Sequence, residues 1–289
     1  MSYGLEPMIK PGMHDRILSE LSLIEQAEGV RIVFACESGS RAWGLSNAHS
    51  DFDVRFLYIR PSQDYLRLDE PRDVIERPLS GNLDINGWDL RKALKLLHKS
   101  NPTLMEWLGS PMVYREVPSI TQKIRNHAAQ NFQPLAAHAH YFHMAKSQFK
   151  SQLQRVCVPA KQYIHALRCV FAMIWIETGM GLVPVDFQAM TDHLTLDPLI
   201  SSEILRLIKL KRQGADLDPG GRNEVIHNFL EQEIRHREQN PPDFPKIATH
   251  IGLLNEIFLE SLAEAWPKPG HHEFPGQGSR EPPKASPIV

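Results

Sequence analysis

The chain has 289 residues, of which 42% are hydrophobic, a formal net charge of -2, and three cysteines without C-x-x-C spacing. These values allow one large domain or two ordinary ones, and they argue against a disulfide framework, a structural zinc site and a protein that binds nucleic acid over its whole surface. The residues near the N-terminus form no apolar segment of the kind found in signal peptides, and the sequence has no run of about 18 apolar residues that would predict a membrane span. We therefore expect a cytoplasmic protein without a membrane partner.

The first predicted elements are a helix and a strand. Asp15 is a candidate N-cap for a helix that runs to about Glu28, because Ile17 and Leu21 recur after it at helical spacing. The apolar run that starts at Val30 predicts a strand. We expect both elements to be part of the scaffold.

Residues 36–59 carry the chemically most informative pattern. Gly39-Ser40 follows the first strand, and after ten intervening residues Asp51-Phe52-Asp53 leads into a second apolar run. This order predicts a strand, a small-residue turn and a second strand. Side chains alternate along a strand, so Asp51 and Asp53 share one face, where two adjacent carboxylates repel each other unless a cation lies between them. Such hard oxygen ligands favour Mg²⁺ over zinc.

Two acids compete for the role of a third carboxylate ligand. Asp89 stands directly before a helical apolar pattern over 90–97 and therefore has a local role as an N-cap. Asp84 lies between Leu83 and Ile85 and has no such local explanation. We assign Asp84 to the carboxylate cluster and Asp89 to the cap, with the reverse assignment as the alternative.

The Gly-Ser turn predicts a phosphate contact. Gly39 permits close approach of the backbone to a phosphate, and the Ser40 hydroxyl can donate a hydrogen bond to its oxygens. Arg41 adds a positive charge beside them. Arg55 continues the face of the two aspartates, so we expect it to pair with them, and a contact with phosphate is the alternative.

Strand signals extend to about residue 115 and are followed by helical patterns. Helices are expected at about 118–130, 135–155, 160–178, 198–212, 222–238 and 247–265. The patterns predict a catalytic domain over 1–115, a helical domain over 116–266 and a disordered Pro/Gly-rich tail over 267–289.

The charges are unevenly distributed along the chain. No Asp or Glu occurs from 117 to 176, a stretch that carries seven Lys and Arg residues. A solvated helix face explains any one of these cations, but the absence of acids over the whole stretch predicts a wall that faces an anion. The seven residues are Lys123, Arg125, Lys146, Lys150, Arg155, Lys161 and Arg168.

Two further patterns are weaker candidates. His138, His140 and His143 lie close together, but they lack the i, i+4 spacing that places two metal ligands on one helix face. Arg222 and His227 match the Arg-x4-His spacing of some helical ribonucleases. In a charged helix a coincidence is the simpler explanation of that match.

The central motifs resemble a known family. Gly39-Ser40 with Asp51-x-Asp53 and a later Asp84 looks like the signature of the DNA polymerase beta superfamily of nucleotidyltransferases. More narrowly, four segments resemble the bacterial and phage nucleotidyltransferases described as the RNA repair pathway polymerase beta family: Gly-Ser-Arg-Ala-Trp-Gly (39–44), Ser-Asp-Phe-Asp-Val-Arg (50–55), Gly-Trp-Asp-Leu-Arg-Lys (87–92) and Asn-Pro-Thr-Leu-Met-Glu-Trp-Leu (101–108). A looser similarity at 161–168 extends the resemblance to roughly residues 30–190.

The resemblance implies an α+β fold in which a small mixed sheet is flanked by helices and followed by a helical domain that closes over the nucleotide. It also implies Mg²⁺, for which a two-ion site is expected, and an NTP donor, expected to be ATP. Asp51, Asp53 and Asp84 are then the metal ligands and the catalytic carboxylates. Lys161 and Arg168, seven residues apart on a helix, are the residues expected to reach the triphosphate.

The resulting hypothesis is a nucleotidyltransferase that moves a nucleoside monophosphate from an NTP to a hydroxyl of an RNA, a protein or a small molecule and releases pyrophosphate. RNA is a possible partner because of the family resemblance. The alternative hypothesis is a nucleotide- or RNA-binding regulatory protein, similar to an antitoxin, that keeps the fold without turnover. The sequence does not identify the acceptor or the oligomeric state.

Overall fold

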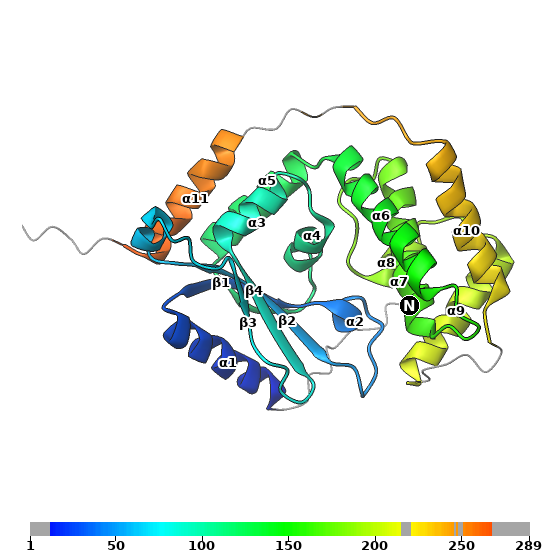
Figure 1. Cartoon of the computed structure of the whole chain (residues 1–289), viewed down its shortest axis with the longest axis horizontal. Helices are drawn as coiled ribbons and strands as arrows, with labels where there is room; N and C mark the ends of the chain where they lie inside the picture. The colour runs from blue at the N-terminus through cyan, green and yellow to red at the C-terminus, as the bar shows by residue number, and fades with distance from the viewer. Residues whose placement is uncertain (1–11, 215–220, 246, 248–250, 268–289) are drawn as a thin grey trace, which may run out of the picture.

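In the computed structural model of the chain, the described residues are 12–214, 221–245, 247 and 251–267. They form two lobes that lie side by side (Figure 1). One lobe, called the sheet lobe here, contains the β-sheet with α1 to α5 and α11. The other, the helical lobe, contains α6 to α10. The expected α+β fold is confirmed.

The sheet has five strands in the order β3-β4-β2-β1-β5. Their bounds are β1 (Arg31–Glu37), β2 (Phe52–Ile59), β3 (Val74–Glu76), β4 (Leu83–Asp89) and β5 (Val113–Glu116). β2 and β4 are parallel, and the other neighbouring strands are antiparallel, so the sheet is mixed as expected. In the parallel pair Asp53 lies opposite Asp84, which brings the two carboxylates to the same end of the sheet.

Helices cover both faces of the sheet. They are α1 (Met13–Glu28), the short α2 (Gly39–Ala42), α3 (Leu90–Leu97), α4 (Pro102–Leu108), α5 (Pro118–Gln130) and α11 (Ile251–Ala265), with a 3-10 turn at Ser62–Leu66. Helix α1 packs Ile17 and Leu21 against one face, and α3, α4, α5 and α11 pack on the other. The cap of α1 differs from the prediction: the helix begins after Gly12, so Asp15 lies inside its first turn.

The alternation of β2 explains where the site lies. Phe52, Val54 and Phe56 are fully buried under α1, as the period of two predicts. On the opposite face the far half of β2 is apolar and covered by helices, with Leu57 in that core. The near half carries Asp53 and Arg55 on this face, and both line a pocket. The strand is therefore apolar where it is covered and charged where it is open.

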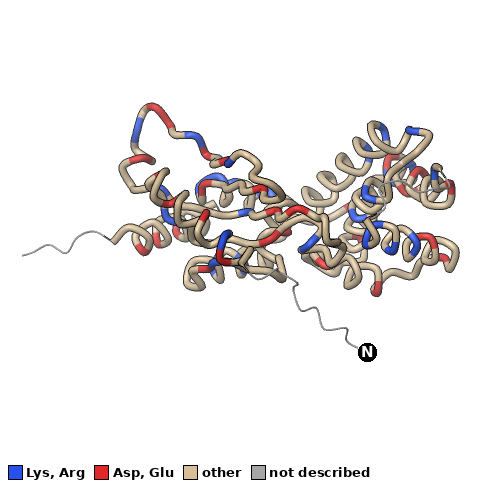
Figure 2. Tube along the Cα trace, turned by 90° about the horizontal axis from the view of Figure 1, so that it is seen from below, with Lys and Arg blue, Asp and Glu red and all other residues tan. Residues whose placement is uncertain are grey.

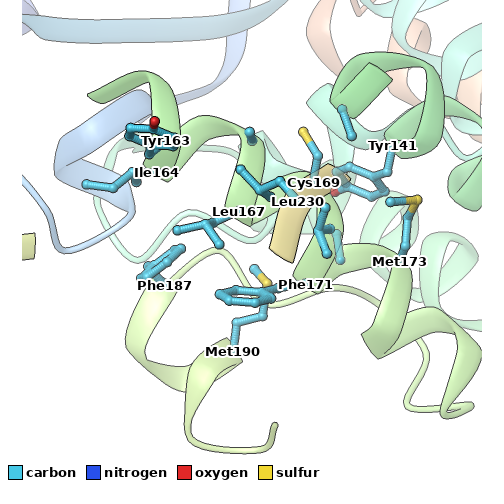
Figure 3. Packing of buried hydrophobic residues seen from close by; sticks show 14 of the residues in the cluster. Tyr141, Tyr163, Ile164, Leu167, Cys169, Phe171, Met173, Phe187, Met190 and Leu230 are labelled. Carbon is cyan, nitrogen blue, oxygen red and sulfur yellow. The ribbon is translucent and has the colours of Figure 1, made fainter. Parts of the chain in front are cut away.

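The helical lobe is built around α7. Its helices are α6 (Pro134–Gln152), α7 (Ala160–Glu177), α8 (Phe187–Thr191), α9 (Pro198–Arg212) and α10 (Glu224–Gln239). Most side chains of α7 are buried, and Phe171 packs near Met190 and Leu230 in the core of the lobe (Figure 3). Among the described helices, none is both long and apolar enough to cross a membrane.

The packing divides the chain differently from the predicted boundary at residue 115. Helix α5 and the last helix, α11, both share the hydrophobic cluster of the sheet lobe. Lys123 of α5 pairs with Glu260 of α11 at 2.8 Å, and the Trp266 indole donates to the Ile59 carbonyl at 3.3 Å. A helical pattern shows that a helix is amphipathic but not which surface it packs on. Of the predicted tail, residues 268–289 lie outside the described part.

Candidate active site

The charged end of the sheet opens into a pocket of about 560 Å³ between the two lobes. Acidic and basic positions both lie where the lobes meet (Figure 2). The sheet lobe lines the pocket with Ser38, Gly39, Ser40, Trp43, Leu45, Asn47, His49, Ser50, Asp51, Asp53 and Arg55, and the helical lobe with Lys161, Ile164, His165, Lys211 and Gly214.

Three aspartates and one arginine form the acidic wall, called the aspartate cluster here. Asp51 is exposed and directly precedes β2, while Asp53 and Asp84 lie on β2 and β4. The Arg55 guanidinium bridges the two strands, at 3.1 Å from Asp53 Oδ1 and 2.8 Å from Asp84 Oδ2. The expected pairing of Arg55 is thus confirmed. Arg55 pairs with two of the three carboxylates, so the cluster keeps an excess of negative charge.

Burial has the largest influence on the ionisation of Asp53 and raises its pKa. Arg55 and Lys161 lower the pKa, while the like charges of Asp84 and Asp51 raise it. The net shift is upward, so the two cations do not compensate for burial and like-charge repulsion together. A bound cation would relieve this repulsion.

Gly39 fits against Asp53 in a way that no other residue could. Its φ is +60°, and a Cβ atom at this position would lie 2.3 Å from Asp53 Oδ2. The predicted Gly39-Ser40 turn forms the start of the short helix α2, and Ser40 lines the pocket. Any side chain at position 39 would displace the carboxylate, so this glycine sets the position of Asp53.

A buried carboxyl that the sequence analysis did not single out supports Asp53 from below. Glu37, at the end of β1, is fully buried and accepts a hydrogen bond from the Asp53 amide at 2.9 Å and another from the Tyr114 hydroxyl. Burial raises the pKa of Glu37 to about 7. The signal in the sequence was an acid at the end of an apolar strand, a place where such a residue needs partners.

Arg41 does not lie where the sequence predicted. Instead of lining the pocket, its guanidinium donates to the carbonyls of Asp51 at 3.0 Å and Ser50 at 2.8 Å. Its Cζ also lies 3.8 Å from the centre of the Phe52 ring. Arg41 therefore holds the backbone segment that carries Asp51, and the predicted phosphate contact is replaced by a structural one.

Arg168 is also placed differently from the prediction. It is 4% exposed, pairs with Glu106 of α4 at 2.7 Å and lies 4.2 Å from the centre of the Trp43 ring. The Trp43 indole in turn donates to Glu106 at 3.3 Å. Spacing along α7 places Arg168 on the same side as Lys161, but at its level the neighbouring element is α4, which encloses it. These three residues connect the two lobes behind the pocket.

Besides Arg55, the cations that line the pocket are Lys161 of α7 and Lys211 of α9, both from the helical lobe. Lys161 is exposed and acts electrostatically on Asp53 across the pocket. Lys211 was not expected, because α9 carries no local motif and reaches the site only through tertiary packing. Its backbone carbonyl accepts a hydrogen bond of 2.7 Å from the side-chain amide of Asn47, which joins the β1–β2 connection to the helical lobe.

The choice between the two candidate third carboxylates follows from their surroundings. Asp89 accepts from the Arg91 amide at 2.8 Å and from the Tyr65 hydroxyl at 3.0 Å, so it is the N-cap of α3, as predicted. It lies at the opposite end of β4 from Asp84. Asp84 is the acid that adjoins Asp53.

The ligand chemistry of the cluster suits Mg²⁺. Within the described residues no group of three or more His, Cys, Asp or Glu side chains converges as a complete metal cage. Mg²⁺ typically needs no such cage, because it is held by one or two carboxylates and completes its shell with waters and substrate phosphates. Asp51 and Asp53 fit that requirement. Arg55 pairs with Asp84 at 2.8 Å and with only one oxygen of Asp53, Oδ1, at 3.1 Å, so Asp51 and the second oxygen of Asp53 fit one ion more directly than the cluster fits two.

Of the weaker candidates, His140 and His143 line a second pocket, whereas His138 is buried and lies 2.7 Å from Glu177. Among the described residues no group of three possible metal ligands forms there. Arg222 pairs with Glu224 at the surface, whereas His227 is buried beside Phe149. The Arg-x4-His spacing therefore brings no pair of catalytic groups together.

Comparisons with known proteins identify the family. A model of the RNA repair pathway DNA polymerase beta family matches residues 13–260. The uncharacterized protein YcgL of Bacillus subtilis (strain 168) is 40% identical over 255 residues, which cover 88% of this chain and 98% of YcgL. A crystal structure of a nucleotidyltransferase-like protein from Exiguobacterium sibiricum 255-15 is 14% identical, with a TM-score of 0.29 over 88% of this chain and 90% of that chain. The first two matches show the family.

Proposed function

The chain belongs to the RNA repair pathway DNA polymerase beta family, and from this premise we propose that it is a Mg²⁺-dependent nucleotidyltransferase. It moves a nucleoside monophosphate from an NTP, with ATP the expected donor, to a hydroxyl of an RNA, a protein or a small molecule, and pyrophosphate leaves. One observation carries the proposal: an aspartate cluster with excess negative charge faces Lys161 and Lys211 across one pocket.

The two walls suit the two ends of the reaction. Bound Mg²⁺ would neutralise polyphosphate charge and align the donor with the acceptor oxygen. Asp51 and Asp53 are its proposed ligands, with Gly39 holding Asp53 in place. Lys161 and Lys211 bind the triphosphate from the opposite side, and the Ser40 hydroxyl donates to a phosphate oxygen.

Asp84 is assigned to the acceptor side. Its carboxylate orients the attacking hydroxyl and takes up its proton as the new phosphate ester forms. Arg55 lies between Asp84 and Asp53, so this role, or the binding of a second ion there, requires the arginine to move aside. A productive complex should therefore lengthen one of the two Arg55 ion pairs.

The experiment is a transfer assay with each α-labelled NTP, Mg²⁺ and, in separate reactions, tRNA, total RNA and cell extract. We expect the label to enter one acceptor class, whereas the same NTP labelled at the γ position transfers nothing, because that phosphate leaves in pyrophosphate. The double variant D51N/D53N should lose the transfer. D69N, at an exposed acid that pairs with Arg67 away from the pocket, is the matched control and should retain it.

A second candidate function rests on Arg55. A guanidinium that already bridges Asp53 and Asp84 also suits a protein that binds an NTP or RNA as a regulator and does not turn it over. The same assay separates the two functions. Tight NTP binding without label transfer to any acceptor favours the regulator, and transfer abolished by D51N/D53N favours the enzyme.

A further inference from the structure

Part of the pocket lining differs in chemical character from the aspartates. Trp43, Leu45, Ile164 and His165 all line the pocket, and Leu45 and Ile164 are each 2% exposed. Two of these residues follow α2 in the sheet lobe, and two belong to α7 in the helical lobe. We call this apolar surface the aromatic wall.

The Trp43 ring in this wall is held in place on several sides. Its indole donates to Glu106, the Arg168 guanidinium lies 4.2 Å from the ring centre, and the His165 ring meets it edge-on at 4.7 Å and 73°. The ring is 9% exposed. A wall fixed in this way costs a ligand little ordering on binding.

His165 gives the wall a polar edge. Burial lowers the pKa of His165 to about 4, so the imidazole is neutral at physiological pH and offers one donor and one acceptor nitrogen. Within the described residues, no hydrogen bond to its ring nitrogens is found. A neutral aromatic ring with a donor and an acceptor matches a ligand that is flat, apolar on its faces and polar at its edges.

Helix α7 carries both a cation and part of the aromatic wall at fixed spacing. Lys161 and His165 are four residues apart and Ile164 is three from Lys161, so the three share one face of the helix. Lys161 acts electrostatically on Asp53, and Ile164 and His165 belong to the aromatic wall. A cation next to a flat and largely apolar surface matches the triphosphate and the base of a nucleotide.

We propose that the aromatic wall is the subsite for the base of the NTP, with Ile164 and His165 against its faces and edge. The inference deepens the proposed function and rests on it. It also assigns the specificity for a nucleoside triphosphate over a bare polyphosphate to these residues, because bound Mg²⁺, Lys161 and Lys211 would contact phosphate whether or not a base is present.

The test compares two ligands that differ in the nucleoside. The Kd values of ATP and of inorganic tripolyphosphate are measured with Mg²⁺ by calorimetry, for wild type, H165A and H165F; GTP, CTP and UTP replace ATP if one binds more tightly. Because stacking on a base is lost with the ring, H165A should weaken NTP binding about tenfold and change tripolyphosphate binding less than about twofold. H165F keeps a flat ring but loses both ring nitrogens, so its Kd for the NTP should lie between those of wild type and H165A.

A matched control exists in the same lobe. His193 meets Trp175 edge-on at 5.3 Å and 75°, a similar pair that does not line the pocket, so H193A should leave both Kd values unchanged. The inference is overturned if the ratio of NTP affinity to tripolyphosphate affinity is the same in wild type and both His165 variants. The aromatic wall would then bind the acceptor or have a structural role only. Failure of the wild type to bind any NTP would instead remove the proposed function.

Discussion

Two groups of charged side chains, one in each lobe, pair acids with an arginine but differ in how fully the acids are compensated. In the helical lobe, Arg237 is 6% exposed and meets both Glu177 oxygens at 2.7 Å and Glu233 at 2.6 Å, while His138 lies 2.7 Å from Glu177. We call this group the arginine cluster. In the aspartate cluster of the sheet lobe, Arg55 pairs with Asp53 and Asp84, two of the three acids.

The difference in balance separates a structural group from a binding site. Burial acts to raise the pKa of Glu177, but hydrogen bonds from His138 and Arg237 outweigh it and hold the pKa below its ordinary value. For Asp53 the same competition ends with the pKa raised. The acids of the arginine cluster are compensated by their own partners, whereas a cation that enters the pocket would stabilise the aspartate cluster.

The largest expected effect follows from removing charge on the unbalanced side. D53N should lower nucleotidyl transfer on the order of a thousandfold, because a metal ligand is lost at the reacting phosphate. The free energy of unfolding should stay the same or rise, since the substitution removes a charge that its surroundings disfavour. Transfer rate and urea denaturation on one preparation measure both. A D53N protein that is inactive and also clearly destabilised would give Asp53 a structural role.

Arg168 and Glu106 form a balanced ion pair behind the pocket, and the substitution R168M should mainly lower the stability of the protein. It leaves the largely buried Glu106 carboxylate without its ionic partner, with the Trp43 indole still donating to it, and we expect a loss on the order of 3 kcal/mol in the free energy of unfolding. Chemical denaturation checks the value. A stable R168M protein with a specific loss of NTP binding would restore the role in triphosphate binding that the sequence suggested.

Breaking the arginine cluster should cost somewhat less. E177Q removes the charge that Arg237 and His138 share, and we expect about 2 kcal/mol less stability at pH 7. E231Q, at an exposed pair with Arg235, is the matched control and should change stability by less than about 0.5 kcal/mol. Equal effects of the two substitutions would contradict the structural role of the cluster.

The effect of E177Q should depend on pH with a definite sign. The pKa of Glu177 is lowered in the folded protein, so its contribution is present above the ordinary value of 4.5 and is lost as the pH falls through the folded pKa. The difference in unfolding free energy between wild type and E177Q should therefore shrink below pH 4.5. A difference that stays constant down to pH 3 would contradict this assignment.

The smallest expected effect concerns the exposed cation of the pocket. K161M should weaken NTP binding about tenfold, the loss of one charge-assisted contact to phosphate, and leave the stability of the protein unchanged. Lys150, which does not line the pocket, supplies the matched variant K150M, with no expected effect on binding. Calorimetry with ATP and Mg²⁺ compares them. Equal affinities of K161M and wild type would remove Lys161 from the site.

Local patterns predicted the sheet end of this site well. The alternation around Asp53, the cap at Asp89 and the pairing of Arg55 depend on neighbours along one or two strands, so the sequence order contains them. Arg41 and Arg168 were placed wrongly because spacing gives the side of an element on which a residue lies, but not the carbonyl or carboxylate that meets it there.

The parts that could not be predicted depend on tertiary packing. Lys211 carries no motif, and the loose similarity at 161–168 gave His165 no role; both reach the pocket because α7 and α9 pack across it from the helical lobe. Glu37 becomes informative once Tyr114 and the Asp53 amide are known to surround it. The return of α11 to the sheet lobe likewise depends on which apolar surface was left uncovered, a property of the assembled fold.

The central claim is that the unbalanced aspartate cluster holds a divalent cation, and Mn²⁺ binding tests it most directly. Mn²⁺ is a spectroscopic substitute for Mg²⁺, and electron paramagnetic resonance measures the free ion as protein is added without nucleotide. We expect saturable binding to wild type and to E177Q, which keeps the aspartate cluster intact, and loss of that binding in D51N/D53N. Equal Mn²⁺ binding by wild type and D51N/D53N, or none by wild type, would contradict the account.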